Sequence, residues 1–127
     1  MSTYKNRSFG ERLSFALRGL AQALSAEASL RAQAVLAAAA LLALLAFRPA
    51  AVWWALVALA STAVLATELL NTAIEHLADE LHPHESSAIR RVKDCAAAAV
   101  LIAVLGALGV ALAFATHLLS GRGHPAA

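Results

Sequence analysis

Four polar side chains recur at helical spacing directly after an uncharged apolar run. They are Glu68, Asn71, Glu75 and Asp79. On one continuous helix they would stand at roughly 0, 300, 340 and 20 degrees around the axis, so they would share one side. A carboxylate stripe at the end of a membrane helix is costly to keep, which makes it a functional hypothesis by default. Carboxylates in this position suit divalent-metal binding and base chemistry at a membrane surface.

The residue types around this stripe fit the transfer of a phosphoryl group. Glu68 comes first after the apolar run, and a carboxylate partly removed from water suits a general base. Glu75 lies further toward water, where it is better placed to hold hydrated Mg²⁺, which prefers one or two carboxylates plus phosphate oxygens. Lys93 supplies the positive charge that a polyphosphate needs. A base, a metal carboxylate and a lysine make a phosphotransfer arrangement.

A set of interfacial ion pairs is the simplest alternative explanation for these charges. Glu27 and Arg31 stand four residues apart, and so do Arg90 and Asp94. Pairs of this kind are frequent and contribute little to stability. We prefer this explanation for Arg90, but it does not account for Glu68 at the lipid boundary.

Composition places the chain in a membrane. Of its 127 residues 61% are hydrophobic and 14% are charged, and the mean hydropathy is +0.70; a soluble domain carries about 25% charged residues. Three stretches lack Lys, Arg, Asp and Glu, and a spanning helix needs about 20 such residues. These stretches are Ala32–Phe47, Pro49–Thr67 and Cys95–Gly121. The first is short, but Leu30 can extend it and Arg31 can snorkel to the interface.

We therefore expect an all-α integral membrane protein with one domain over residues 1–127. Its spans are expected at about 30–48, 50–80 and 94–120, with a tight hairpin at Arg48-Pro49. A cleaved signal peptide fits poorly, because a long polar segment precedes the first apolar stretch. The basic residues are not clustered as binding to nucleic acid requires. The single cysteine, Cys95, excludes an internal disulfide.

The basic residues predict the orientation of the chain. Eight of the ten lie before the first span or between the second and third, namely Lys5, Arg7, Arg12, Arg18, Arg31, Arg90, Arg91 and Lys93. Only Arg48 and Arg122 fall on the opposite side. The positive-inside rule then places the N-terminus and the carboxylate stripe on the cytoplasmic side, where ATP and magnesium are found.

The segment before the first span, about 8–26, is expected to be an amphipathic surface helix. Its apolar residues fall on one face, namely Phe9, Leu13, Ala16, Leu17, Leu20 and Leu24. Such a helix lies in the interface plane. Phe15 projects from the polar face instead. It is either a stray exposed aromatic, which is common, or a residue that stacks on a ligand base.

The order of these residues resembles the prokaryotic diacylglycerol kinase family. The central pattern is Glu68-Leu-Leu-Asn71-Thr-Ala-Ile-Glu75, followed by Lys93-Asp94 and a helix of small residues. Upstream, Glu27 stands four residues before Arg31, and Arg18-Gly19-Leu20 is similar to a step in the family's surface helix. The similarity covers roughly residues 9–118.

The resemblance implies a small kinase of the bacterial cytoplasmic membrane, a homotrimer with active sites shared between subunits. It implies that Glu68 is the catalytic base supported by Asn71, and that Glu27 and Glu75 hold Mg²⁺ with ATP. By the same resemblance the nucleotide contacts are Phe15, Glu27, Glu75, Asp79, Lys93 and Asp94, and the lipid contacts are Glu68, Arg31 and Arg18. The family's N-terminal arginine corresponds to Arg7 or Arg12. The loop His82–Ile89 departs from the family pattern.

The expected activity is ATP-dependent phosphorylation of a membrane lipid alcohol, diacylglycerol first, which gives phosphatidate. Undecaprenol kinase is the alternative within the family, because the apolar spans offer no side-chain chemistry that separates the two lipids. A second alternative, from a different class, is a non-catalytic membrane subunit whose carboxylates bind ions. ATP, the lipid, the bilayer and other copies of the chain are the expected partners.

Overall fold

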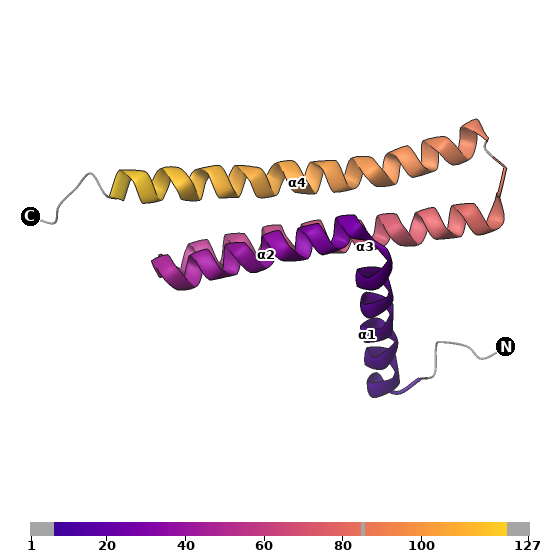
Figure 1. Cartoon of the computed structure of the whole chain (residues 1–127), viewed down its shortest axis with the longest axis horizontal. Helices are drawn as coiled ribbons and strands as arrows, with labels where there is room; N and C mark the ends of the chain where they lie inside the picture. The colour runs from indigo at the N-terminus through magenta and orange to yellow at the C-terminus, as the bar shows by residue number, and fades with distance from the viewer. Residues whose placement is uncertain (1–6, 85, 122–127) are drawn as a thin grey trace, which may run out of the picture.

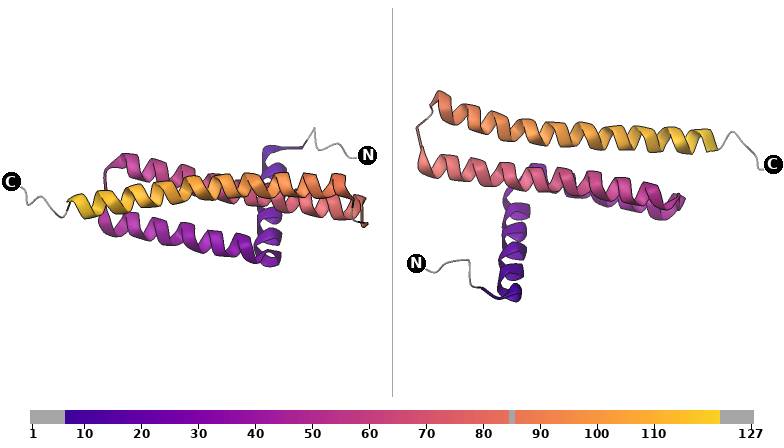
Figure 2. Two further views of the ribbon diagram at one scale, coloured as in Figure 1. Left: turned by 90° about the horizontal axis from the view of Figure 1, so that it is seen from above. Right: turned by 180° about the vertical axis from the view of Figure 1, so that it is seen from behind.

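Four α-helices make up the part of the chain that the structure, a computed structural model, describes, which is residues 7–84 and 86–121. In chain order they are α1 (Phe9–Ala26), α2 (Ala28–Phe47), α3 (Ala51–Leu81) and α4 (Ser87–Gly121). The three long helices run alongside one another, and α1 turns away across their common direction (Figure 1). The views from above and from behind show the same arrangement (Figure 2).

The three helices α2, α3 and α4 are long and apolar enough to cross a membrane, which confirms the three predicted helices. α3 has 31 residues and α4 has 35. At 1.5 Å per residue α3 is about 46 Å long, whereas the hydrocarbon core of a bilayer is about 30 Å thick. α3 is therefore long enough to carry its polar end beyond the hydrocarbon. It runs without a break through the apolar segment and the carboxylate stripe.

The helix ends follow from local sequence. α1 begins with a capping box, in which the Ser8 N–H donates to Oε2 of Glu11 at 2.9 Å and the Ser8 hydroxyl accepts from the Glu11 N–H. Glu27 is extended, with φ −100° and ψ 115°, and it both ends α1 and begins α2. Arg48 has φ 45° in the left-handed region and ends α2, and Pro49 follows. This is the predicted tight hairpin.

The helix α4 begins at Ser87, earlier than the third span, which the sequence predicts from about residue 94. α3 ends at Leu81, shortly before Pro83, and α4 begins at Ser87. The Ser86 hydroxyl accepts a hydrogen bond of 3.2 Å from the Ile89 N–H, which is the geometry of an N-cap. The first turns of α4 are therefore a charged helical segment that leads into the apolar part of the helix.

The core of the single chain is thin. α3 is the common partner, since it packs against α4 and α2 and also meets α1. The buried hydrophobic residues are Leu30, Leu44, Val64, Ala78 and Ala96. Many large apolar side chains on the spans are exposed, among them Leu36, Leu59, Ile102 and Leu112. In water these surfaces would be a liability, whereas lipid or other membrane helices can cover them.

An aromatic cluster joins the three long helices at the end away from α1. The ring of Phe114 on α4 lies 6.4 Å from Phe47 on α2 and 5.2 Å from Trp53 on α3. The Trp53 ring also lies 5.2 Å from the His117 ring. Edge-on and tilted aromatic contacts at these separations are favourable. This cluster lies next to the α2–α3 hairpin and joins α2 and α4 to α3 there.

Candidate active site

Glu68 is a buried carboxylate on α3 that faces α2. Its residue exposure is 6%. The Ser29 hydroxyl donates to Oε1 of Glu68, and the Gln33 amide donates to Oε2 at 3.1 Å. A carboxylate away from water is costly unless hydrogen bonds satisfy it, and here a donor from α2 reaches each oxygen. Glu68 thus lies where the sequence predicts the base, at the inner end of the stripe.

The next two residues of the stripe, Asn71 and Glu75, contact each other. The Asn71 amide donates to Oε1 of Glu75 at 3.1 Å, a contact between residues one turn apart. Both side chains are partly buried, and Thr72 between them is buried at 7% exposure. In this structure Asn71 therefore orients Glu75, whereas the family resemblance implies that it supports Glu68.

Glu27 approaches the same part of α3 from the kink between α1 and α2. Its Oε1 lies 3.5 Å from Nε2 of His76, and 31% of its side chain is exposed. His76 follows Glu75 directly in the sequence. The carboxylate of Glu27 therefore lies beside the turn of α3 that carries His76 and Glu75, and its contact there is with His76.

The outer end of the stripe contacts α4. The Lys93 ammonium donates to the carboxylate of Asp79, which joins α3 and α4 where they leave the apolar region. Asp94, the next residue, lines an open depression together with Ser86, Ser87, Arg90 and Arg91. Lys93 and Asp94, the two α4 residues that are expected to contact nucleotide, thus lie near the start of α4, beside the end of α3.

Arg31 does not pair with Glu27 in the part of the chain that the structure describes. Its guanidinium donates instead to the backbone carbonyls of Leu24 and Ser25, at 3.0 and 2.9 Å. These carbonyls lie in the last turn of α1, where a positive charge also complements the helix dipole. Arg31 therefore fixes α1 against α2, and the expected ion pair of Arg31 with Glu27 is replaced by the contact of Glu27 with His76.

Phe15 on α1 contacts two arginines, Arg18 on the same helix and Arg7 just before it. The guanidinium carbon of Arg18 is 4.7 Å from the ring centroid, and that of Arg7 is 5.3 Å away. Both distances suit cation–π contacts. Phe15 is therefore partnered rather than a stray aromatic. Arg7 and Arg12 are the two candidates for the family's N-terminal arginine, and Arg7 is the one that contacts Phe15 in this structure.

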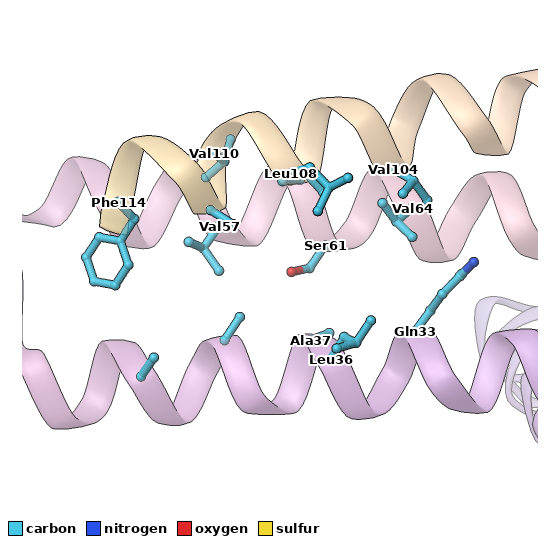
Figure 3. Close-up of a pocket in the computed structure, with 15 residues that line it drawn as sticks. Gln33, Leu36, Ala37, Val57, Ser61, Val64, Val104, Leu108, Val110 and Phe114 are labelled. Carbon is cyan, nitrogen blue, oxygen red and sulfur yellow. The ribbon is translucent and has the colours of Figure 1, made fainter. Parts of the chain in front are cut away.

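An apolar cavity of about 370 Å³ lies between α2, α3 and α4, directly beside the Glu68 contacts. Figure 3 shows Gln33 at one end and Phe114 at the other, with Ser61 and Leu108 between them. Small side chains from all three helices widen it, namely Ala37, Ala40, Ala43, Ala60, Ala107 and Ala111. The volume is in the range of small-molecule sites. Gln33 both lines this cavity and donates to Glu68.

Sequence reasoning missed Ser29, Gln33 and His76. Each contacts a predicted site residue from a different helix, so no local pattern reveals the contact. A signal was present for two of them, since Ser29 and Gln33 stand four residues apart and Gln33 is a polar residue inside the first apolar span. His76 lies about 80 degrees from Glu68 on the helix and falls outside the stripe.

These features define an all-helical membrane protein with a carboxylate-rich site at one end of its spans. The family model described as prokaryotic diacylglycerol kinase matches residues 14–115, which is most of the chain. The chain therefore belongs to the prokaryotic diacylglycerol kinase family, a family of lipid kinases, as the sequence analysis predicts. A comparison with curated proteins found no match.

Proposed function

We propose that this protein transfers the γ-phosphoryl group of ATP to a membrane lipid alcohol, and that the alcohol is diacylglycerol, so that the product is phosphatidate. The observation that carries this proposal is the position of Glu68. It is a buried carboxylate that accepts a hydrogen bond from Gln33, which lines one end of the apolar cavity, and it stands on the same helix as the carboxylates of the outer stripe. A lipid alcohol needs a base and an apolar surface, which Glu68 and the cavity would supply. A polyphosphate needs a metal ion and a positive charge, which the outer carboxylates and Lys93 would supply.

Glu68 is the residue that we assign to the lipid hydroxyl. A general base must lie within hydrogen-bond reach of the proton that it takes. The cavity beside it is lined by alanine, valine and leucine side chains, which suit a hydrocarbon chain. With the chain in the cavity, the hydroxyl would lie at the polar end, beside Gln33 and Glu68. The proton would move to a Glu68 oxygen as the alcohol oxygen attacks the phosphorus.

Glu27 and Glu75 are the residues that we assign to Mg²⁺. Within the described residues no group of three or more His, Cys, Asp and Glu side chains forms a metal cage. Mg²⁺ bound with a nucleotide does not need one, because one or two carboxylates plus phosphate oxygens and water suffice. The ion would neutralise negative charge on the phosphates. Lys93 and Asp94 would hold the nucleotide from α4 beside Asp79, which Lys93 contacts, and Phe15 would stack on the base.

A membrane setting and an assembly of several copies also belong to this proposal. From the distribution of basic residues we infer a site on the cytoplasmic side, and we assign the protein to the cytoplasmic membrane of a bacterium. The exposed apolar surfaces and alanine runs of the spans suit packing of three copies into a trimer. α1, with Phe9, Leu13 and Leu17 exposed, would lie on the membrane surface.

Purified protein in detergent with a panel of lipid alcohols tests the proposal directly. Radiolabelled ATP and thin-layer separation should reveal labelled phosphatidate from diacylglycerol. Labelling of undecaprenol alone would move the assignment to undecaprenol kinase. If the protein consumes ATP with neither lipid, the result would support a non-catalytic ion-binding subunit instead.

A further inference from the structure

The two hydrogen bonds to Glu68 come from donors of different kinds on the same face of α2. Ser29 and Gln33 are four residues apart, so a helix presents both toward α3. The Gln33 amide nitrogen donates to Oε2, and the Ser29 hydroxyl donates to Oε1. Each oxygen of the carboxylate is therefore engaged, although the proposed reaction requires one of them to receive a proton from a lipid hydroxyl.

The surroundings of Gln33 suit a permanent anchor. Its side chain is partly buried and lines the apolar cavity. Its carbonyl oxygen is buried and accepts no hydrogen bond from the described residues. The bond to Glu68 is thus the one polar contact that the structure gives this amide. If the Gln33 amide lost this partner, a buried donor would be left unsatisfied, which would destabilise the folded protein.

The surroundings of Ser29 suit an exchangeable partner. Ser29 is exposed in the single chain, so no neighbouring helix of this chain stops its hydroxyl from turning away from Glu68 when another group takes its place. It also presents to Oε1 the same chemical group, an alcohol, that the lipid must present. An alcohol at the end of a hydrocarbon chain can therefore replace Ser29 at this oxygen without a new type of interaction.

We propose that Gln33 is a positioning residue that fixes Oε2 of Glu68, and that Ser29 occupies Oε1 until the hydroxyl of the lipid acceptor displaces it. This inference rests on the proposed kinase function. Oε1 is then the oxygen that receives the proton, because the lipid hydroxyl takes the place of Ser29 and donates to this oxygen, while Oε2 keeps its bond to Gln33. The alcohol oxygen forms its bond to phosphorus, and the bond from that phosphorus to the ADP oxygen breaks.

Two substitutions separate the two roles. Gln33→Met keeps the length of the side chain and removes the donor, and we expect it to lower kcat by about tenfold or more, with little change in the KM for the lipid. Ser29→Ala removes the competing hydroxyl, and we expect it to raise kcat/KM for the lipid several-fold, through a lower KM. Steady-state kinetics of the full-length protein with diacylglycerol in mixed micelles give both parameters.

Matched controls come from α1, which offers the same residue types away from Glu68. Ser25→Ala removes a hydroxyl that donates to the Gln22 carbonyl, and Gln22→Met changes an exposed side chain. Both should keep wild-type kinetics. Thermal unfolding of each variant shows whether it is folded. If Gln33→Met does not fold well, combining Glu68→Gln with Gln33→Leu tests the coupling, since the second change should add nothing to the first.

The outcomes are distinguishable from failure of the kinase proposal. If the wild-type protein phosphorylates no lipid alcohol, the function itself is wrong. If the wild type is active and Gln33→Met keeps its kcat, Gln33 does not position the base. If Ser29→Ala instead lowers kcat as Gln33→Met does, Ser29 is not displaced by substrate and the placeholder role is wrong.

Discussion

Lys93 on α4 and Asp79 on α3 form an ion pair at the point where these two helices leave the apolar region. The pair brings a cation from the third long helix to the outer end of the carboxylate stripe. Its side chains are 33% and 64% exposed, so the pair is open to solvent and contributes little to stability. In the proposed nucleotide site, Lys93 would exchange this carboxylate partner for a phosphate.

Replacing Lys93 with methionine should weaken ATP binding more than it weakens folding. We expect Lys93→Met to raise the KM for ATP by about 10- to 100-fold, the range for losing a hydrogen bond to a charged group. The KM for the lipid should stay near the wild-type value. Arg48→Met, at the opposite end of the long helices, is the control for loss of positive charge. An equal effect of both changes would indicate general electrostatics rather than a specific contact.

Removing the charge of Glu68 should abolish most turnover. Glu68→Gln keeps the size of the side chain, and we expect kcat to fall by about 10²–10⁴-fold, the usual contribution of a general base. Equilibrium binding of ATP should be retained, because Glu68 faces α2 rather than the outer stripe. Glu80→Gln, an exposed position on the same helix, serves as the control. Nearly intact turnover in Glu68→Gln would show that the base lies elsewhere.

Glu75→Gln should change the requirement for magnesium. The carboxylate is oriented by Asn71, so the amide variant keeps the shape of the site but loses a charged oxygen ligand. We expect the Mg²⁺ concentration for half-maximal activity to rise, with part of the lost rate recovered at high Mg²⁺. Titration of activity with Mg²⁺ at saturating ATP measures this. A low rate that no Mg²⁺ concentration improves would argue against a metal ligand at this position.

The long helices could be predicted because their signals are local. The uncharged stretches give α2, α3 and α4, and Arg48-Pro49 gives the hairpin between the first two. The periodicity of the stripe requires one unbroken helix, and α3 has that form. Each of these inferences uses residues close together in the chain, where sequence spacing fixes geometry.

The contacts between helices could not be predicted in the same way. Ser29 and Gln33 lie 39 and 35 residues before Glu68, and their pairing depends on how α2 is rotated and shifted against α3. Nothing local sets this register, because the apolar residues of a membrane helix surround it on every side. The contact between His76 and Glu27 has the same origin. The family resemblance named Glu27 and Glu68, but not the side chains that hold them.

Filling the apolar cavity should weaken lipid binding while the nucleotide site is unaffected. Ala107 on α4 lines the middle of the cavity, so Ala107→Phe would occupy space that we assign to a hydrocarbon chain. If the added ring excludes two methylene groups, at about 0.8 kcal/mol each, the KM for diacylglycerol should rise by about tenfold. Leu112→Phe, on an exposed part of the same helix, is the matched control. The KM for ATP should not move in either variant, since Glu75 and Asp79, which we assign to the nucleotide and its metal, lie further along α3 than Glu68, away from the cavity. A lipid KM that is unchanged in Ala107→Phe would place the chain outside this cavity, on the exposed face of the spans or between copies of the protein.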